Sequence, residues 1–292
     1  MNLNFMITAI KKFILKLILR LGFSIVRKEN LLNHKGILTV TNSGLNLISS
    51  PEDMVVGHSL RTLGYWEIEE VKRLKLYIKK LKISRSDNLL VVGGHIGSIA
   101  LELGDDFASV DVIEANPDNF FLLDLNIKLN NKKKIFPHNF LASDDISDKS
   151  FLLHPSNTGG SKLMPIVKDY DYFKDNPLPI KSKGVILDNF FKKKIFKVMI
   201  MDIEGSEIYA LRGSQKILSN LSILQVEFAP IHIRDTTGLN SDHFCDLIFP
   251  YFKKIYIPTY DKEYEIEESR NVLKKMYEKN ISNSGLIFFN LS

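Results

Sequence analysis

Seven short apolar runs recur between residues 88 and 290, and stretches with helical spacing of apolar side chains separate them. Apolar runs of this length, bounded by polar or glycine-containing turns, are typical of buried strands. Their alternation with helices predicts an α/β fold with a mostly parallel, seven-stranded sheet and helices on both faces. We expect the strands at residues 88–92, 110–114, 134–138, 197–202, 222–228, 252–257 and 285–290.

Three other segments depart from this alternation. Residues 27–50 are polar and contain glycine, which predicts a connector with short strands or irregular structure. From residue 52 to 82 apolar side chains follow a helical period, and we expect Gly64 to divide this stretch into two helices. Residues 142–185 are rich in Ser, Asp, Asn, Pro and Gly. This stretch is longer than an ordinary connection, so we expect a functional insertion near a ligand.

Residues 3–26 are apolar but interrupted by basic side chains, and Lys12, Lys16 and Arg20 recur on one helix face. The pattern predicts an amphipathic helical extension. Its uncharged stretches are too short for a membrane span, which needs about 20 residues, and no small-residue cleavage site indicates a secretory signal. The helix either lies on the inner surface of a membrane or docks on the protein or on a second copy. The sequence does not set the oligomeric state.

Composition narrows the class of protein. With 292 residues, of which 45% are hydrophobic, the chain can bury a large core. The net charge of +5 comes with lysine clusters at 132–134 and 192–194, and no aromatic-interleaved basic stripe accompanies them. We therefore interpret them as solvated ends of elements and expect no nucleic-acid partner. Cys245 is the only cysteine, which excludes an internal disulfide and indicates a reducing, cytoplasmic setting, with the inner membrane face as an alternative.

The main candidate site begins where the first two strands end. The first strand leads into a glycine-rich turn at residues 93–97 (GGHIG), and Glu114 ends the second strand. Gly93 and Gly97 allow a sharp turn and let a ligand lie against the main chain. A carboxylate about 20 residues further on is placed to accept both hydroxyls of a ribose. The turn lacks the third glycine of a dinucleotide site, which favours a nucleoside ligand without phosphates, such as S-adenosylmethionine.

A second group of side chains follows the strand at residues 197–202. Asp202 and Glu204 come at its carboxyl end, where ligands lie in an open α/β sheet, so we expect them to face the same crevice as Glu114. Glu207 begins the next helix, where capping explains a carboxylate. An acidic group at the end of a buried strand is unfavourable without a partner or a function, and we favour a function for Asp202.

These pieces together resemble the FkbM-type methyltransferase family between about Gly64 and Tyr256. The block Asp202-Ile203-Glu204-Gly205-Ser206-Glu207 is the most specific piece. The others, in chain order, are residues 64–67 (GYWE), the glycine turn, residues 113–117 (IEANP), residues 159–161 (GGS), residues 187–188 (LD) and residues 226–228 (VEF). The resemblance implies a class I, Rossmann-like methyltransferase domain, which we place at residues 51–292 after a helix and connector at 1–50. It also implies S-adenosylmethionine as cofactor and methylation of hydroxyl groups, often on sugars or other secondary metabolites.

The resemblance also implies which residues form the site. The acceptor, a small molecule or glycan, is expected to contact Tyr65, Trp66 and Glu67, although core packing explains the two aromatic residues equally well. The residues expected to bind the cofactor are Gly93, Gly94, His95, Gly97, Glu114, Ala115, Asn116, Ala142 and Asp202.

Three positions depart from the family's pattern. The family usually reads Asp-x-Gly-Ala-Asn-x-Gly at the first turn, where this chain has Val91 in place of the aspartate and His95 in place of the asparagine. The lysine expected two residues before Asp202 is Ile200. Loss of a charged contact with the cofactor could lower affinity by roughly 1 to 3 kcal/mol. His95 is either an alternative donor to the cofactor or a helix-start residue with no ligand role.

For the chemistry, we expect Asp202 to orient the acceptor hydroxyl or to accept its proton, with Glu204 and His232 as further candidates. Asp202, Glu204 and His232 could also hold a divalent metal, but one histidine and two carboxylates are not a diagnostic ligand set, so we predict no metal. Two rival functions stay open. Val91 and Ile200 are consistent with a non-catalytic binding or scaffolding member of the fold, and the glycine spacing weakly permits an NAD-dependent oxidoreductase.

Overall fold

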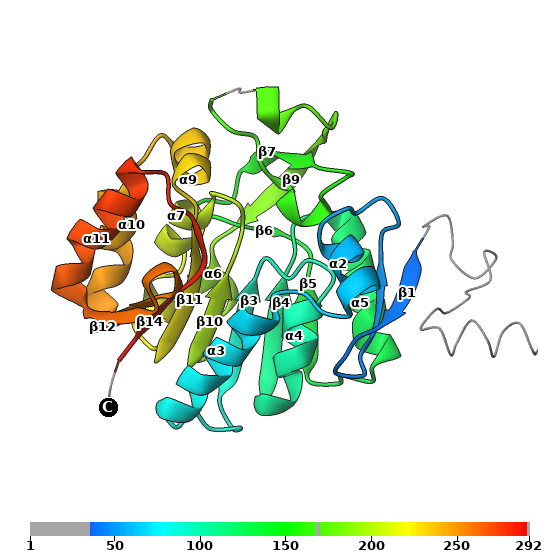
Figure 1. Ribbon diagram of the computed structural model, residues 1–292, viewed down its shortest axis with the longest axis horizontal. Helices are drawn as coiled ribbons and strands as arrows, with labels where there is room; N and C mark the ends of the chain where they lie inside the picture. The colour runs from blue at the N-terminus through cyan, green and yellow to red at the C-terminus, as the bar shows by residue number, and fades with distance from the viewer. Residues whose placement is uncertain (1–35, 168–169, 291–292) are drawn as a thin grey trace, which may run out of the picture.

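The computed structural model describes residues 36–167 and 170–290, and its centre is a sheet of eight strands (Figure 1). The amphipathic helix predicted at residues 3–26 lies outside the described residues. In spatial order the strands are β13 (Lys262–Glu265), β12 (Lys254–Ile257), β14 (Asn283–Phe289), β11 (Ile223–Phe228), β10 (Val198–Met201), β3 (Asn88–Val92), β4 (Ser109–Ile113) and β5 (Ile135–His138).

All seven predicted strands are present, and their directions confirm a mostly parallel sheet. Strands β11, β10, β3, β4 and β5 are parallel to one another, while β14 lies between β11 and β12 and is antiparallel to both. The eighth strand, β13, pairs antiparallel with β12 at the edge of the sheet. The sequence gives no sign of β13, because its residues (KEYE) are polar and partly exposed and form no apolar run.

Helices cover both faces of the sheet, and each face has its own core. The strand residues alternate between them, so that Leu89 and Val91 pack in one core and Leu90 and Val92 in the other. One face is covered by α2 (Val56–Leu63), α3 (Ile68–Lys80), α4 (Ser98–Leu103) and α5 (Pro117–Leu129). The other is covered by α6 (Leu187–Phe190), α7 (Glu207–Arg212), α8 (Gln215–Leu218), α9 (Pro230–Thr237), α10 (Ser241–Ile248) and α11 (Ile266–Glu278).

The segments before the first sheet strand fold much as their patterns predict. Gly64 ends α2 with a left-handed φ of 79°, and α3 begins shortly afterwards. The connector forms a hairpin of β1 (Ile37–Val40) and β2 (Asn46–Ser49). Asn126, fully buried in α5, accepts a hydrogen bond from the Ile48 amide (2.7 Å) and donates to the carbonyls of Ile48 (3.0 Å) and Ile96 (2.9 Å). This side chain therefore ties the hairpin to the glycine turn.

The polar insertion at residues 142–185 contains strands of its own. A small sheet of order β6-β9-β7-β8 combines β6 (Leu141–Ala142), β9 (Leu178–Val185), β7 (Asp148–Leu153) and β8 (Lys162–Leu163). Strands β7 and β9 lie beyond the central sheet at the upper edge of the molecule in Figure 1. Phe151 and Leu163 form its buried apolar cluster with Leu141. Within the described part of the chain, no helix is both long and apolar enough to cross a bilayer.

Candidate active site

The glycine turn after β3 is shaped by close contacts with the neighbouring strands. Gly93 has a φ of +92°, and a Cβ atom there would lie 1.8 Å from the carbonyl oxygen of Asp202. A Cβ on Gly94 would lie 2.1 Å from Val112 Cγ1. Gly97, with a φ of +94°, precedes the first residue of α4. The glycines are therefore required for the turn to pack against β4 and β10, in addition to any contact with a ligand.

Glu114 follows β4 directly and holds the turn in place. One carboxylate oxygen accepts a hydrogen bond from the backbone N–H of His95 and the other from that of Asn116, each at 2.7 Å. Burial raises the pKa of Glu114 to about 7, although the backbone donors oppose this shift. The backbone N–H of Ala115 and the side chain of Asn119 also lower the pKa of Glu114 through hydrogen bonds to its carboxylate.

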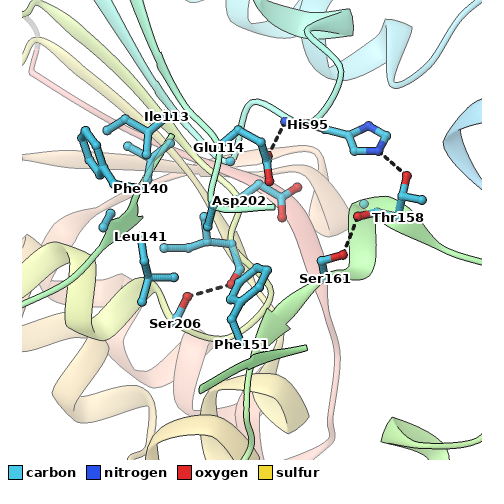
Figure 2. A pocket seen from close by; sticks show the side chains of 16 residues that line it. His95, Ile113, Glu114, Phe140, Leu141, Phe151, Thr158, Ser161, Asp202 and Ser206 are labelled. Atoms are coloured by element: carbon cyan, nitrogen blue, oxygen red, sulfur yellow. Dashed lines mark hydrogen bonds between the residues drawn. The ribbon is translucent and has the colours of Figure 1, made fainter. Parts of the chain in front are cut away.

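A pocket lies between the ends of β3, β4 and β10 and the insertion, and Figure 2 shows its lining. We call it the first pocket. It brings together Gly93, His95, Glu114, Ala115, Ala142 and Asp202 of the predicted cofactor residues. The rest of its lining combines apolar side chains with the insertion's small and hydroxyl residues: Val92, Ile113, Phe140, Leu141, Phe151, Thr158, Gly159, Ser161, Ile203 and Ser206.

Gly97 and Asn116, two of the predicted cofactor residues, are not among the residues that line the first pocket, and both have structural contacts. A Cβ on Gly97 would lie 2.4 Å from Leu101 Cδ1, within the core. Asn116 is the N-cap of α5, where its side-chain oxygen accepts from the Asp118 amide (2.9 Å). Its amide group also donates to Ser161 Oγ (3.1 Å), which links the cap to the insertion.

His95 joins the glycine turn to two segments that the sequence analysis did not connect with it. Its Nε2 lies 2.7 Å from Thr158 Oγ1, which in turn donates to Asp53 Oδ2 (3.0 Å). Burial lowers the pKa of His95 to about 4, against the attraction of the nearby Asp53 carboxylate, so the imidazole is neutral at pH 7. His95 also has a left-handed φ of +47°. Asparagine and histidine are both enriched in that conformation, which explains why either residue suits this position.

A second pocket adjoins the first. The two share Gly93, His95, Gly159 and Asp202 in their linings. Of the predicted acceptor residues, Trp66 and Glu67 line the second pocket, whereas Tyr65 lies in a separate surface depression beside Asn42 and Ile68. The other side chains that line the second pocket include Val91, Ile200, Glu204, Glu227 and Ser284.

Carboxylates gather in the second pocket. Burial, and then the neighbouring carboxylates Glu204, Glu67 and Glu207, raise the pKa of Asp202 well above 3.8. Burial and the charges of Glu70 and Glu204 raise the pKa of Glu67 to about 7. Glu67 and Glu204 also have left-handed φ angles of 47° and 56°. Such backbone conformations are unfavourable by about 1 to 3 kcal/mol each and cluster at functional sites.

Glu204 and Glu207 have different partners. Lys162 Nζ and His232 Nδ1 each lie 3.0 Å from Glu204 Oε2. Burial alone would raise the pKa of Glu204, but the contacts with His232 and Lys162 lower it to about 2. Glu207 accepts hydrogen bonds from the backbone amides of Ile203 (2.9 Å) and Gly205 (3.0 Å). Glu207 is the first residue of α7, and these hydrogen bonds fasten the loop before the helix without capping the helix itself.

The two apolar departures from the family's pattern lie side by side. Val91 on β3 and Ile200 on β10 are direct partners in the parallel pairing of these strands, and both line the second pocket. Replacing both members of a buried charged pair with apolar residues leaves no unpaired charge and is often neutral for stability. The two departures from the family's pattern therefore fall on paired positions of the sheet.

A known protein family matches this chain. The profile of the FkbM methyltransferase domain matches residues 92–256, more than half of the chain. The chain belongs to the FkbM methyltransferase family. The matched segment of this methyltransferase runs from the end of β3 to β12 and contains Glu114, Asp202, Glu204 and His232. Comparison with curated protein sequences finds no significant match.

Solved structures with similar folds include further methyltransferases. WbdD has a TM-score of 0.46 at 10% identity, over 82% of this chain and 45% of its own. A precorrin-6y C5,15-methyltransferase from Geobacter metallireducens GS-15 has a TM-score of 0.39 at 6% identity, over 82% of this chain and 100% of its own. The N-terminal domain of EvdMO1 with SAH bound has a TM-score of 0.32 at 8% identity, over 59% of this chain and 53% of its own.

Proposed function

We propose that this protein transfers the methyl group of S-adenosylmethionine to a hydroxyl group of a sugar, glycan or related metabolite. The observation that carries the proposal is the junction of the two pockets at Gly93, His95 and Asp202. A donor in the first pocket and an acceptor in the second would meet beside the Asp202 carboxylate. Membership of the FkbM family supports methyl transfer, and the resemblance described above favours a hydroxyl acceptor.

The first pocket fits the nucleoside part of S-adenosylmethionine. Glu114 lines this pocket directly after β4, where a carboxylate can accept the two hydroxyls of a ribose. Ile113, Phe140, Leu141 and Phe151 offer apolar surface to an adenine base. When bound, the sulfonium supplies an electrophilic methyl carbon, so the protein's contribution is alignment and removal of a proton.

Asp202 is the residue to which we assign the acceptor proton. It lines both pockets, whereas Glu204 lines only the second and is held by Lys162 and His232. A carboxylate that contacts a lysine ammonium group is a weaker proton acceptor than one without such a contact. Trp66 lines the same pocket and offers an aromatic surface on which a sugar ring can pack.

The test is calorimetric titration of the full-length protein with S-adenosylmethionine, with NAD in a parallel titration. We expect saturable binding of S-adenosylmethionine that Glu114→Ala abolishes, and no binding of NAD. Transfer of a labelled methyl group to a panel of sugars is then expected to fall by about 10²-fold or more in Asp202→Asn, with binding retained. A wild-type protein that is folded but does not bind S-adenosylmethionine would support the non-catalytic alternative.

A further inference from the structure

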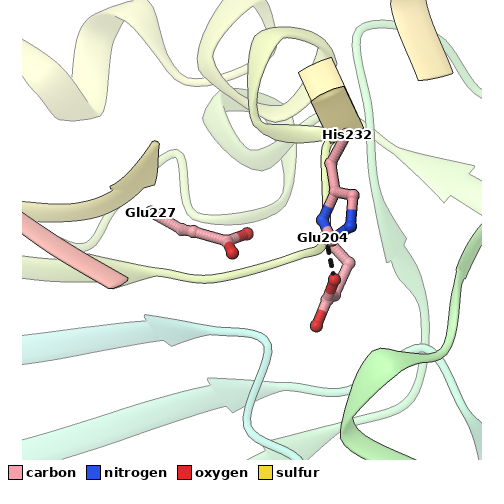
Figure 3. A group of neighbouring side chains, drawn as sticks. All are labelled: Glu204, Glu227 and His232. Atoms are coloured by element: carbon pink, nitrogen blue, oxygen red, sulfur yellow. Dashed lines mark ion pairs between the residues drawn. The ribbon is translucent and has the colours of Figure 1, made fainter. Parts of the chain in front are cut away.

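Three metal-binding side chains from different elements converge at the second pocket. Glu204 follows β10, Glu227 lies on β11, and His232 lies in the first turn of α9. One ligand atom from each lies within 4.8 Å of the other two. Figure 3 shows the carboxylate of Glu227 directed toward the pair formed by Glu204 and His232. The sequence analysis considered Asp202, Glu204 and His232 as metal ligands and predicted no metal. It gave no role to Glu227, which lies in the segment at residues 226–228 (VEF).

Two of these ligand atoms are enclosed but unsatisfied. Glu227 Oε2 and His232 Nδ1 are buried, and neither forms a hydrogen bond with any described residue. His232 Nδ1 lies 3.0 Å from Glu204 Oε2, but the contact lacks hydrogen-bond geometry. Adjacent ligands at 2.1 Å from an octahedral ion lie about 3.0 Å apart. The separation fits two neighbouring ligands of one ion, and it is the orientation of the two groups that argues against a hydrogen bond.

In the described part of the chain, the carboxylates around Glu204 outnumber the ammonium groups that contact it. Lys162 is the one ammonium group of the described residues that contacts Glu204, at 3.0 Å. Asp202, Glu67 and Glu227 line the same pocket as Glu204. Buried charges are normally paired or bound to a metal. One lysine does not balance this set of carboxylates, so its members must share protons or bind a further cation.

We propose that Glu204, Glu227 and His232 bind a divalent cation that prefers oxygen ligands, of the Mg²⁺ or Mn²⁺ class, at the wall of the second pocket. Two carboxylates and one imidazole suit Mn²⁺ in particular, since it accepts nitrogen as well as oxygen. Its binding rests on the side-chain geometry alone, whereas its use in catalysis rests on the proposed methyl transfer. An acceptor hydroxyl bound to such an ion loses its proton more readily.

The experiment uses Mn²⁺ as the probe and the metal-free, full-length protein without S-adenosylmethionine. Calorimetry is expected to give one site, and pulsed electron paramagnetic resonance is expected to show coupling from one imidazole nitrogen. Glu227→Gln and His232→Ala should each weaken binding by at least about 10-fold. His232→Ala should also remove the nitrogen coupling. Glu268→Gln, on the exposed side of α11, is the matched control and should leave the affinity unchanged.

Lys162→Met tests whether Glu204, Glu227 and His232 bind a cation or only stabilise the fold. If Lys162 and the ion compete for Glu204, removal of the lysine should tighten Mn²⁺ binding. Absence of saturable Mn²⁺ binding, or binding that neither Glu227→Gln nor His232→Ala weakens in folded protein, would overturn the proposal. The nitrogen coupling of the wild-type protein keeps the test decisive if a variant fails to fold. Titration with S-adenosylmethionine in the presence of EDTA measures cofactor binding without the metal. The metal site and the proposed methyl transfer can therefore be refuted independently.

Discussion

Glu114→Gln tests the first pocket most directly because it changes a charge and one acceptor while keeping the side chain's size. The wild-type carboxylate accepts one backbone N–H on each oxygen, from His95 and from Asn116. Glutamine has a single acceptor oxygen, so its NH₂ group must face one of these N–H groups. An unsatisfied buried donor costs about 1 to 3 kcal/mol. We therefore expect a stability loss of that size.

The same substitution should weaken binding of S-adenosylmethionine. Hydrogen bonds to a charged group are worth about 1.5 to 3 kcal/mol, against about 1 for neutral ones. Loss of the charge opposite the ribose should therefore lower the affinity by about 2 kcal/mol, or ~30-fold. The loss should be largest above pH 7, where Glu114 is ionised, because burial raises its pKa to about 7.

The sign of the pH dependence follows from that shift. Between its ordinary value of 4.5 and about 7, Glu114 keeps a proton in the folded state that the unfolded chain has lost. Its contribution to stability is therefore present at low pH and falls by up to roughly 3 kcal/mol as the pH rises through this window. Ligand binding follows the opposite trend, because the ionised carboxylate accepts the ribose hydroxyls better.

Calorimetric titrations of wild type and Glu114→Gln at pH 6, 7 and 8 measure both effects, with circular dichroism to verify folding. The ratio of the two dissociation constants isolates Glu114 from other groups that titrate, and it should grow from pH 6 to pH 8. A ratio near one at pH 8, or a ratio independent of pH, would refute the role of Glu114 as the ribose acceptor.

Three further substitutions test the framework of the site. Val91→Asp should destabilise the protein by about 3 to 5 kcal/mol in urea unfolding, and Ile200→Lys on its pairing partner should recover much of this loss; additive losses would contradict the coupling of the two positions. Gly93→Ala should lower the melting temperature or abolish folding, since its Cβ would lie 1.8 Å from a backbone oxygen; a wild-type melting temperature would contradict this. Thr158→Val removes the contact with His95 and should weaken S-adenosylmethionine binding by about 1 kcal/mol; an unchanged Kd would contradict it.

The fold was predictable from local patterns because the sheet is buried on both faces. The central strands β3 and β10 are apolar runs, the other parallel strands are mainly apolar, and Gly64 marks the break between α2 and α3. The edge strand β13 and the small sheet of the insertion were not predictable in this way. These strands mix polar and apolar residues without a continuous apolar run, and they are held by pairing with partners distant in sequence, as in the pairing of Asp148 with Lys183. Period-two apolar patterning is weak in strands with little buried surface.

The residues of the candidate site were likewise predictable only in part. Gly93, Glu114 and Asp202 follow strand ends of the parallel sheet, where topology alone directs them to one crevice. Asp53 and Thr158 were missed, because they reach His95 from a loop and from the insertion. The left-handed φ of His95 was foreseeable, since the family's asparagine at that position is a residue that favours it.

The pairing of Val91 with Ile200 changes the weight of the non-catalytic alternative. Read along the sequence, each departure removes one polar contact, and together they suggest a decaying site. In the sheet the two positions face each other across β3 and β10. Decay at random would first remove one partner and leave the other charge buried, which costs about 3 to 5 kcal/mol. A matched apolar pair avoids that cost, while Glu114 and Asp202, which line the first pocket, are retained. The paired positions therefore do not by themselves indicate loss of activity, and we predict from them a changed choice of acceptor.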